Sequence, residues 1–72
     1  MNWTLTEKEM FIAKLVADGL QNAEIAVLTG NTEYVIKNKI RTIFDKLGLW
    51  NRTELAMWYV KHEHDNAQKG GV

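Results

Sequence analysis

Three glycines divide this chain into four stretches that each carry the signals of a helix. They are Gly19, Gly30 and Gly48, and each follows a stretch in which apolar residues recur every three or four positions. Glycine adopts the left-handed backbone conformation that commonly ends a helix, at little cost in free energy. The sequence contains no proline, so helices joined by short turns are the expected architecture.

Residues suited to begin a helix precede three of these stretches. Thr6 and Glu9 match a capping box, in which each side chain accepts a hydrogen bond from the backbone N–H of the other residue. Asn51 and Glu54 form a second such pattern, and Thr32 is a further N-cap. The predicted helices span about residues 7–18, 33–47 and 52 onward, with the tail frayed from about residue 65. A short helix is predicted to start at residues 21–24 and to end near residues 29–30.

The third predicted helix has the clearest core face. Ile36, Ile40, Ile43 and Leu47 are spaced by four, three and four positions, which places them on one side of a helix. The 72 residues allow one small domain, and the absence of cysteine excludes a disulfide framework and a thiolate metal site. We therefore expect an all-α, four-helix domain over residues 1–65 and a flexible C-terminal tail over residues 66–72.

The formal net charge is zero, but the charges are unevenly distributed. Residues 1–36 hold two cations and five acids, residues 37–52 hold five cations and one acid, and residues 53–72 hold two cations and three acids. Such a basic segment is either a solvated helix face or the footprint of a polyanionic partner such as a phosphate backbone. Charge alone favours the solvated face.

Two helices joined by a short turn at Gly30, the second with exposed Lys, Asn and Arg, are the parts of a helix-turn-helix. More specific are the motifs at residues 5–9 (LTxKE), 17–26 (AxGLxNxEIA), 37–38 (KN) and 43–56 (IxxKLGLxNRTELA). Over residues 5–60, without a gap, these motifs resemble the LuxR/GerE-type DNA-binding domain. The resemblance implies a tetrahelical helix-turn-helix domain of the free-standing, GerE-like kind.

The resemblance also implies roles for individual residues. The positions that read bases in this family fall on Lys37, Asn38 and Arg41. Their chemistry agrees, because Arg and Lys donate to guanine O6 and N7 and Asn pairs with adenine N6 and N7. For Arg52 an ion pair with Glu9 is an alternative to a phosphate contact. Predicted backbone or auxiliary contacts to DNA fall on Asn22, Thr32, Glu33, Tyr34, Val35, Lys39, Lys46 and Arg52.

Five positions depart from the pattern that the family usually shows. Val35 replaces a Thr and Ala23 often a Lys, which removes groups that would anchor a phosphate backbone. Lys39 stands in place of a His and restores part of that anchoring. Thr29 and Asn31 occupy turn positions where the family has apolar residues. We therefore expect weaker DNA binding that is less sensitive to salt, and a differently packed turn.

The tryptophans bear on oligomeric state. Trp3 and Trp50 are predicted to pack on the core. Trp58 and Tyr59 are consecutive and cannot both face one small core, so one of them is expected to lie exposed in an apolar patch that marks an interface. We predict a homodimer through the last helix, with the interface residues Met57, Trp58, Lys61 and His62.

Other functions find little support in the sequence. His62 and His64 bracket Glu63, but residues two apart point to different sides of a helix, so a metal site is not expected. No nucleophile–base arrangement or phosphate-binding loop is present, so neither an enzyme nor a cofactor is expected. Without an apolar run of roughly 20 residues or a secretory signal, we expect a cytoplasmic protein that does not enter a membrane.

The favoured hypothesis is a sequence-specific transcription regulator that binds double-stranded DNA as a homodimer, with the third helix in the major groove. No receiver domain fits in this length, so a signal would act through expression level, degradation or a partner. The alternative is a protein-binding anti-activator that captures another transcription regulator and blocks its DNA binding. A non-specific architectural DNA binder is a weaker third possibility, because the chain has one basic stripe.

Overall fold

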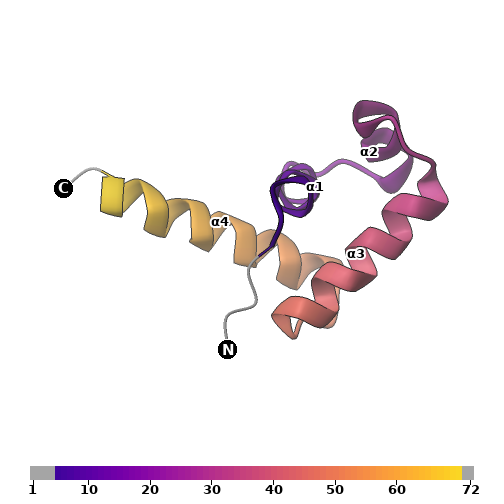
Figure 1. The fold of residues 1–72 in the computed structure, drawn as a ribbon. Coiled ribbons are helices and arrows are strands. Elements are labelled where there is room, and N and C mark those ends of the chain that lie inside the picture. Colours follow the sequence, from indigo (N-terminus) through magenta and orange to yellow (C-terminus); the bar gives the residue numbers. More distant parts are fainter. Residues whose placement is uncertain (1–4, 71–72) are drawn as a thin grey trace.

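Four helices follow one another in the computed structural model: α1 (Glu7–Ala17), α2 (Asn22–Thr29), α3 (Glu33–Leu47) and α4 (Arg52–Gly70). The structure describes the backbone of residues 5–70 and the side chains of residues 5–65. No strand occurs in this described part of the chain. The expected all-α, four-helix fold is confirmed (Figure 1).

The predicted caps explain where the first and third helices begin. Thr6 Oγ1 accepts the N–H of Glu9 at 3.1 Å, and Glu9 Oε1 accepts the N–H of Thr6 at 2.9 Å, which completes the capping box. Thr32 Oγ1 accepts the N–H of Val35 at 3.2 Å. Each bond satisfies a backbone donor that a helix otherwise leaves unpaired at its N-terminus.

The fourth helix differs from the prediction at both ends. Asn51 Oδ1 accepts the N–H of Glu54 at 2.9 Å, as predicted, but the Glu54 carboxylate accepts the N–H of Trp50 at 2.6 Å and not that of Asn51. The helical backbone continues to Gly70, beyond the expected fraying from Asp65. Residues 66–69 include neither proline nor glycine, so no strong helix breaker stops the helix there.

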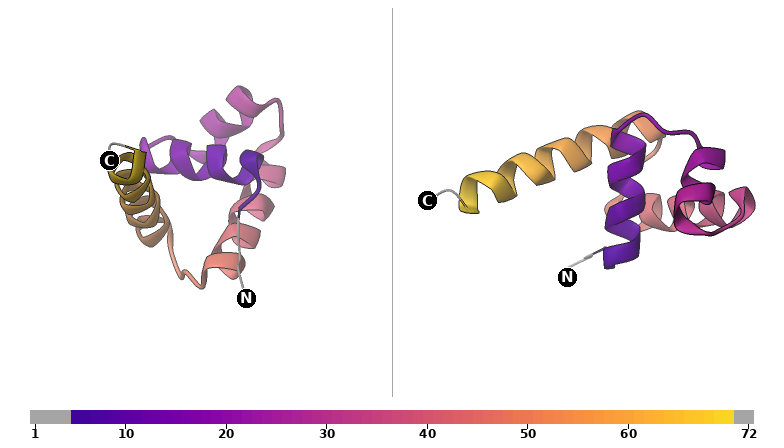
Figure 2. Two further views of the ribbon diagram at one scale, coloured as in Figure 1. Left: turned by 60° about the vertical axis from the view of Figure 1, so that its left-hand side comes forward. Right: turned by 90° about the horizontal axis from the view of Figure 1, so that it is seen from above.

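One small core joins all four helices. Its fully buried large side chains come from every helix: Ile12, Ile25, Ile36, Ile43 and Leu55. Each contributes roughly 1.5–3 kcal/mol by leaving water. Helix α1 lies between α4 and the α2–α3 pair and packs on both α3 and α4, as the views in Figures 1 and 2 agree. The predicted isoleucine face of α3 is confirmed as this core face.

Helix α4 extends away from the other three helices. Its first turns cross α1 near the core, and the remainder projects past α1 (Figure 2), which makes the molecule 40 Å long against 25 and 20 Å in the other directions. A projecting helix covers only part of its own surface with the rest of the chain. Side chains on its outer side are therefore left to solvent or to a partner.

The tryptophans correct two predictions. Trp50 is 86% exposed and is not a core residue, because Leu49 takes the inward position in the α3–α4 loop and the next side chain points outward. Trp58 and Tyr59 are both partly buried against the core, so the prediction that one of them would be exposed is wrong. They lie on either side of the buried Leu55 position, where α4 crosses α1. The prediction for Trp3 falls outside the described residues.

Candidate nucleic-acid interface

Helices α2 and α3 form a compact pair joined by a tight turn. Gly30 adopts φ +69°, in the left-handed region, and ends α2. The N–H of Asn31 then donates to the carbonyl oxygen of Ala26 at 2.9 Å. The fully buried Ile25 and Ile36 join the two helices at the core. This is the predicted helix-turn-helix arrangement, with α3 as its second helix.

Lys37, Asn38 and Arg41 project from the outer side of α3, and we call them the reading face. All three are exposed and lie opposite the core isoleucines of the same helix. Within the described residues, none of the three side chains makes a hydrogen bond or an ion pair, so their donors are available to a ligand. The exposed neighbours on this side of α3 are Glu33, Tyr34 and Asp45.

Arg52 is held by neutral groups. Its Nη1 donates to Asn22 Oδ1 at 2.7 Å and its Nη2 donates to the carbonyl oxygen of Leu20 at 2.5 Å. The alternative ion pair with Glu9 is not formed. Neither acceptor is a carboxylate, so neither bond offsets the positive charge of the guanidinium. The two bonds tie the start of α4 to the start of α2.

Arg52 also lies next to the reading face. A hollow of about 250 Å³ on one flank of α3 is lined by Arg52 together with Lys37 and Arg41, and no carboxylate lines it. Three cations without a counter-ion at one surface make a site that favours an anion. The lining of this three-cation hollow is Asn22, Lys37, Ile40, Arg41, Phe44 and Arg52.

Lys46 lies on the other flank of α3 and has a partner. Its Nζ contacts Glu9 Oε1 at 2.8 Å, with the two side chains 25% and 14% exposed. Partial burial by itself would raise the pKa of Glu9, but the hydrogen bonds from Lys46 and Thr6 together with the charge of Lys46 outweigh it, and the pKa lies below its ordinary value. A contact of Lys46 with DNA would therefore compete with this ion pair.

Lys39 is half-buried on that same flank, near the α2–α3 turn. The turn itself is held by polar bonds: Thr29 Oγ1 donates to the carbonyl oxygen of Ile25 at 2.8 Å, and Asn31 Nδ2 donates to Thr29 Oγ1 at 3.0 Å. Beside the turn is a hollow of about 280 Å³, which we call the turn hollow. Its lining is Lys8, Phe11, Ile12, Thr29, Asn31 and Lys39.

The remaining predicted contact residues serve local structure. The Asn22 side chain accepts from Arg52, and the Thr32 hydroxyl caps α3. Val35 is half-buried and has no polar side-chain atom to offer a phosphate. Arg52 and Asn22 lie 30 positions apart in the sequence, so local spacing could not predict the hydrogen bond between them.

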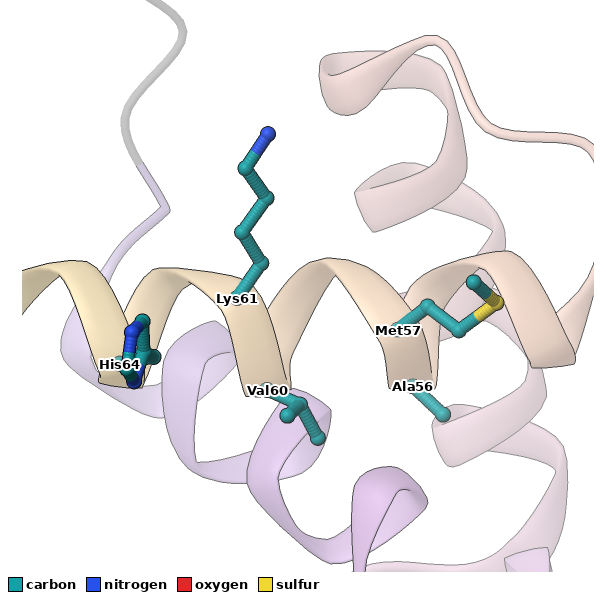
Figure 3. Close-up of a pocket in the computed structure, with 5 residues that line it drawn as sticks. All are labelled: Ala56, Met57, Val60, Lys61 and His64. Carbon is teal, nitrogen blue, oxygen red and sulfur yellow. The ribbon is translucent and has the colours of Figure 1, made fainter.

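The outer side of α4 carries exposed apolar side chains one helical turn apart. Met57 is 67% and Val60 59% exposed. Figure 3 shows Val60 and Ala56 on one side of the helix and the Lys61 chain extending away on the other. Together with His64 these residues line a shallow groove, which we call the α4 strip: Ala56, Met57, Val60, Lys61 and His64.

The structure divides the predicted dimer residues between two sides of α4. Met57 and Lys61 belong to the α4 strip, whereas Trp58 and His62 lie on the inner side, where their rings stack with centroids 5.0 Å apart at 11°. Val60 and His64 were missed by the sequence analysis, although helical spacing from Met57 would have indicated both.

Neither a metal cluster nor a membrane span emerges from the described residues. No group of three or more His, Cys, Asp or Glu side chains gathers among them. None of the helices in this part of the chain combines the length with the apolarity that crossing a bilayer requires.

Comparison with known proteins identifies the family. The sequence pattern of the luxR family of bacterial regulatory proteins matches residues 3–59. The chain belongs to the luxR family. LuxR-family proteins are DNA-binding regulators of transcription and not enzymes, which confirms both the family resemblance and the expectation that this is not an enzyme.

Three similar proteins are regulators that are longer than this luxR-family chain. It is 42% identical over 50 residues to the transcriptional regulatory protein YdfI of Bacillus subtilis, covering 69% of this chain and 24% of YdfI. Identity to the response regulator VraR of Staphylococcus aureus is 36% over 58 residues, covering 81% and 28%. Identity to the probable transcriptional regulator ycf29 of Guillardia theta is 34% over 59 residues, covering 82% and 27%.

This luxR-family chain thus spans about a quarter of the length of the relatives it matches. No solved structure gives a significant match to it.

Proposed function

We propose that this chain binds double-stranded DNA in a sequence-specific way and regulates transcription, with α3 placed in the major groove. The observation that carries the proposal is the reading face. Its two cations and one amide are exposed, unpaired within the described residues, and mounted opposite a core that fixes α3. An α-helix fits the width of the major groove, where each base pair presents a distinct pattern of donors and acceptors.

Within this proposal the residues have different tasks. Lys37 and Arg41 donate to guanine edges, and Asn38 pairs with adenine. Arg52 holds a phosphate from the flank, since its guanidinium is fixed and uncompensated at the three-cation hollow. The proposed auxiliary contacts are Asn22, Thr32, Glu33, Tyr34, Val35, Lys39 and Lys46.

We further propose that two copies pair through the α4 strip. An apolar strip on a projecting helix is stabilised by a second copy because both Met57 side chains then leave water. Paired recognition helices would read half-sites one helical turn apart, roughly 34–36 Å. Lys61 and His64 form the polar edge of such an interface.

A mobility-shift titration tests DNA binding. Purified protein is mixed with a duplex obtained by in vitro selection and with a random duplex of equal length, at two salt concentrations. The selected duplex is expected to bind more tightly, and both complexes to weaken as salt rises, because each phosphate contact releases a counter-ion.

Absence of any shift at low salt would contradict the proposal. A stable complex with a second transcription regulator, found together with that absence, would instead support the anti-activator alternative.

A further inference from the structure

Residues of α1, of α2 with its turn, and of α3 together line the turn hollow. Lys8, Phe11 and Ile12 come from α1, Thr29 and Asn31 from the end of α2 and the turn, and Lys39 from α3. Its volume of about 280 Å³ lies just below the range of typical ligand sites, roughly 300–1,000 Å³. A matching occupant is therefore a small molecule.

The inner part of the turn hollow is apolar. Ile12 is 2% exposed and belongs to the core, whereas Phe11, which also lines the hollow, is 45% exposed. Covering the Phe11 ring with an apolar group would remove it from water. A bare phosphate would gain nothing from this surface.

The charges at the turn hollow are both positive. Neither Lys8 nor Lys39 has an ion pair or hydrogen bond within the described residues, and no carboxylate lines the hollow. Of the two acids that flank Lys8 in the sequence, Glu9 is already bonded to Lys46 and Thr6, and Glu7 forms no ion pair among the described residues. Two unpaired ammonium groups at one small hollow favour an anion between them.

The polar part of the rim is fixed before any ligand arrives. Asn31 Nδ2 donates to Thr29 Oγ1 at 3.0 Å, and Thr29 Oγ1 in turn donates to the carbonyl oxygen of Ile25. These bonds hold both side chains in place and leave Asn31 Oδ1 without a donor among the described residues. A preformed rim lowers the ordering cost of binding.

From these features we propose that the turn hollow binds a small organic carboxylate with an aromatic or branched aliphatic body. The carboxylate lies between Lys8 and Lys39, and the body covers Phe11 and Ile12. Such a ligand joins α1 to α3 across the turn that sets the position of α3. Binding itself does not depend on the proposed DNA function, but any effect of the ligand on DNA affinity does.

The first test is a titration of the isotopically labelled protein followed by its ¹H–¹⁵N NMR spectrum. The probes are phenylacetate and 4-methylpentanoate, with phenylacetamide as the neutral analogue and inorganic phosphate as the anion without a body. We expect saturable shifts at the amides of Phe11, Thr29 and Asn31 with both carboxylates. Phenylacetamide and phosphate are expected to bind at least about tenfold more weakly. Phenylacetamide lacks the negative charge, and phosphate lacks the apolar body.

Variants then locate the site. Thr29→Leu adds volume inside the turn hollow, and the double variant Lys8→Gln, Lys39→Gln removes both charges. Each is expected to weaken carboxylate binding at least about tenfold. The matched control is Lys37→Gln, on the reading face of the same helix, which should bind the carboxylates as the wild type does. Thermal unfolding of each variant confirms that it is folded.

Three results would overturn the inference. One is the lack of saturable shifts with either carboxylate, and another is equal binding by Thr29→Leu and the wild type. The third is a combined result: phosphate binds as well as phenylacetate, and the double lysine variant loses affinity for DNA but keeps its affinity for the carboxylates. That outcome would make Lys8 and Lys39 a contact for the DNA backbone, whether or not the proposed reading face is correct.

Discussion

Helices α3 and α4 each present an outer surface to solvent, and the two surfaces have opposite character. The reading face of α3 offers Lys37 and Arg41 with no counter-ion among the described residues, whereas the α4 strip offers Met57 and Val60 with more than half of each side chain exposed. Unpaired cations gain most from a polyanion, and exposed apolar groups gain most from another apolar surface. This difference is what supports our proposal of two kinds of partner for one small domain.

The same contrast exists within α3 itself. Lys37 and Arg41 are unpaired, while Lys46, further along the helix, is bonded to Glu9 of α1. The segment that is basic in sequence is thus split by the fold into a part available for binding and a part that holds α3 on α1. The first part should respond more strongly to DNA, because a DNA contact of Lys46 would have to compete with its ion pair to Glu9.

The largest expected effect is on the free energy of unfolding, when a side chain of the core that positions both surfaces is shortened. Ile43→Ala should lower the free energy of unfolding by about 2–5 kcal/mol, because Ile43 is 0% exposed and its removal leaves a cavity. Urea denaturation followed by circular dichroism measures the change. Val27→Ala is the matched control, since Val27 is 81% exposed. A loss below 1 kcal/mol in Ile43→Ala, relative to that control, would contradict the assigned core.

Next in size is the effect of Arg41 on specific DNA binding. Arg41→Ala should cost about 1–3 kcal/mol in binding to the selected duplex and relax preference at one base position. Fluorescence anisotropy at fixed salt measures it. Lys14→Ala, which removes an α1 cation that pairs with the C-cap residue Asp18, serves as the control and should change little. Unchanged binding by Arg41→Ala would remove this residue from the reading face.

A charge in the α4 strip should act on self-association without affecting the reading face. Met57→Glu is expected to raise the dimer dissociation constant by at least about tenfold, which corresponds to 1.4 kcal/mol, because it places a carboxylate in an apolar contact. Sedimentation velocity over a concentration series measures this. Val27→Glu makes the same kind of change on α2 and should leave association as in the wild type. Monomeric behaviour of the wild-type protein would contradict the proposed pairing.

The smallest effect concerns the ion pair that holds α3 on α1. The pKa of Glu9 is lowered in the folded state, so its contribution is present above its unfolded pKa of about 4.3 and is lost as pH falls through the folded pKa. Glu9→Gln should therefore cost up to about 1 kcal/mol near pH 7, and the difference from wild type should shrink below pH 4. Urea denaturation at several pH values measures it, and a difference independent of pH would contradict this account.

The local features of the fold could be predicted from the sequence because they depend on neighbours along the chain. The Thr6 and Thr32 caps, the left-handed Gly30 and the isoleucine face of α3 are all set by residues of one helix and the turn next to it. Helix propensity and spacing are sufficient for such features. For the same reason the exposure of Lys37 and Arg41 followed from the core face opposite them.

What the sequence did not show depends on contacts between distant segments. Arg52 and Asn22 are 30 positions apart, and Lys46 and Glu9 are 37 apart, so no local pattern pairs them. The exposure of Trp50 depends on how the loop turns after Leu49, and hydrophobicity alone predicted the wrong side. The turn hollow likewise requires three helices to be placed before it exists.

Mapping DNA binding on the protein tests the central claim most directly, because it compares the two outer surfaces in one experiment. The ¹H–¹⁵N spectrum of the labelled protein is recorded with and without the selected duplex at fixed salt. We predict the largest shifts at residues 33–42 of α3 and at the start of α2, with smaller changes along residues 56–64 of α4. Shifts confined to the α4 strip, with the amides of Lys37 and Arg41 unchanged, would contradict the account.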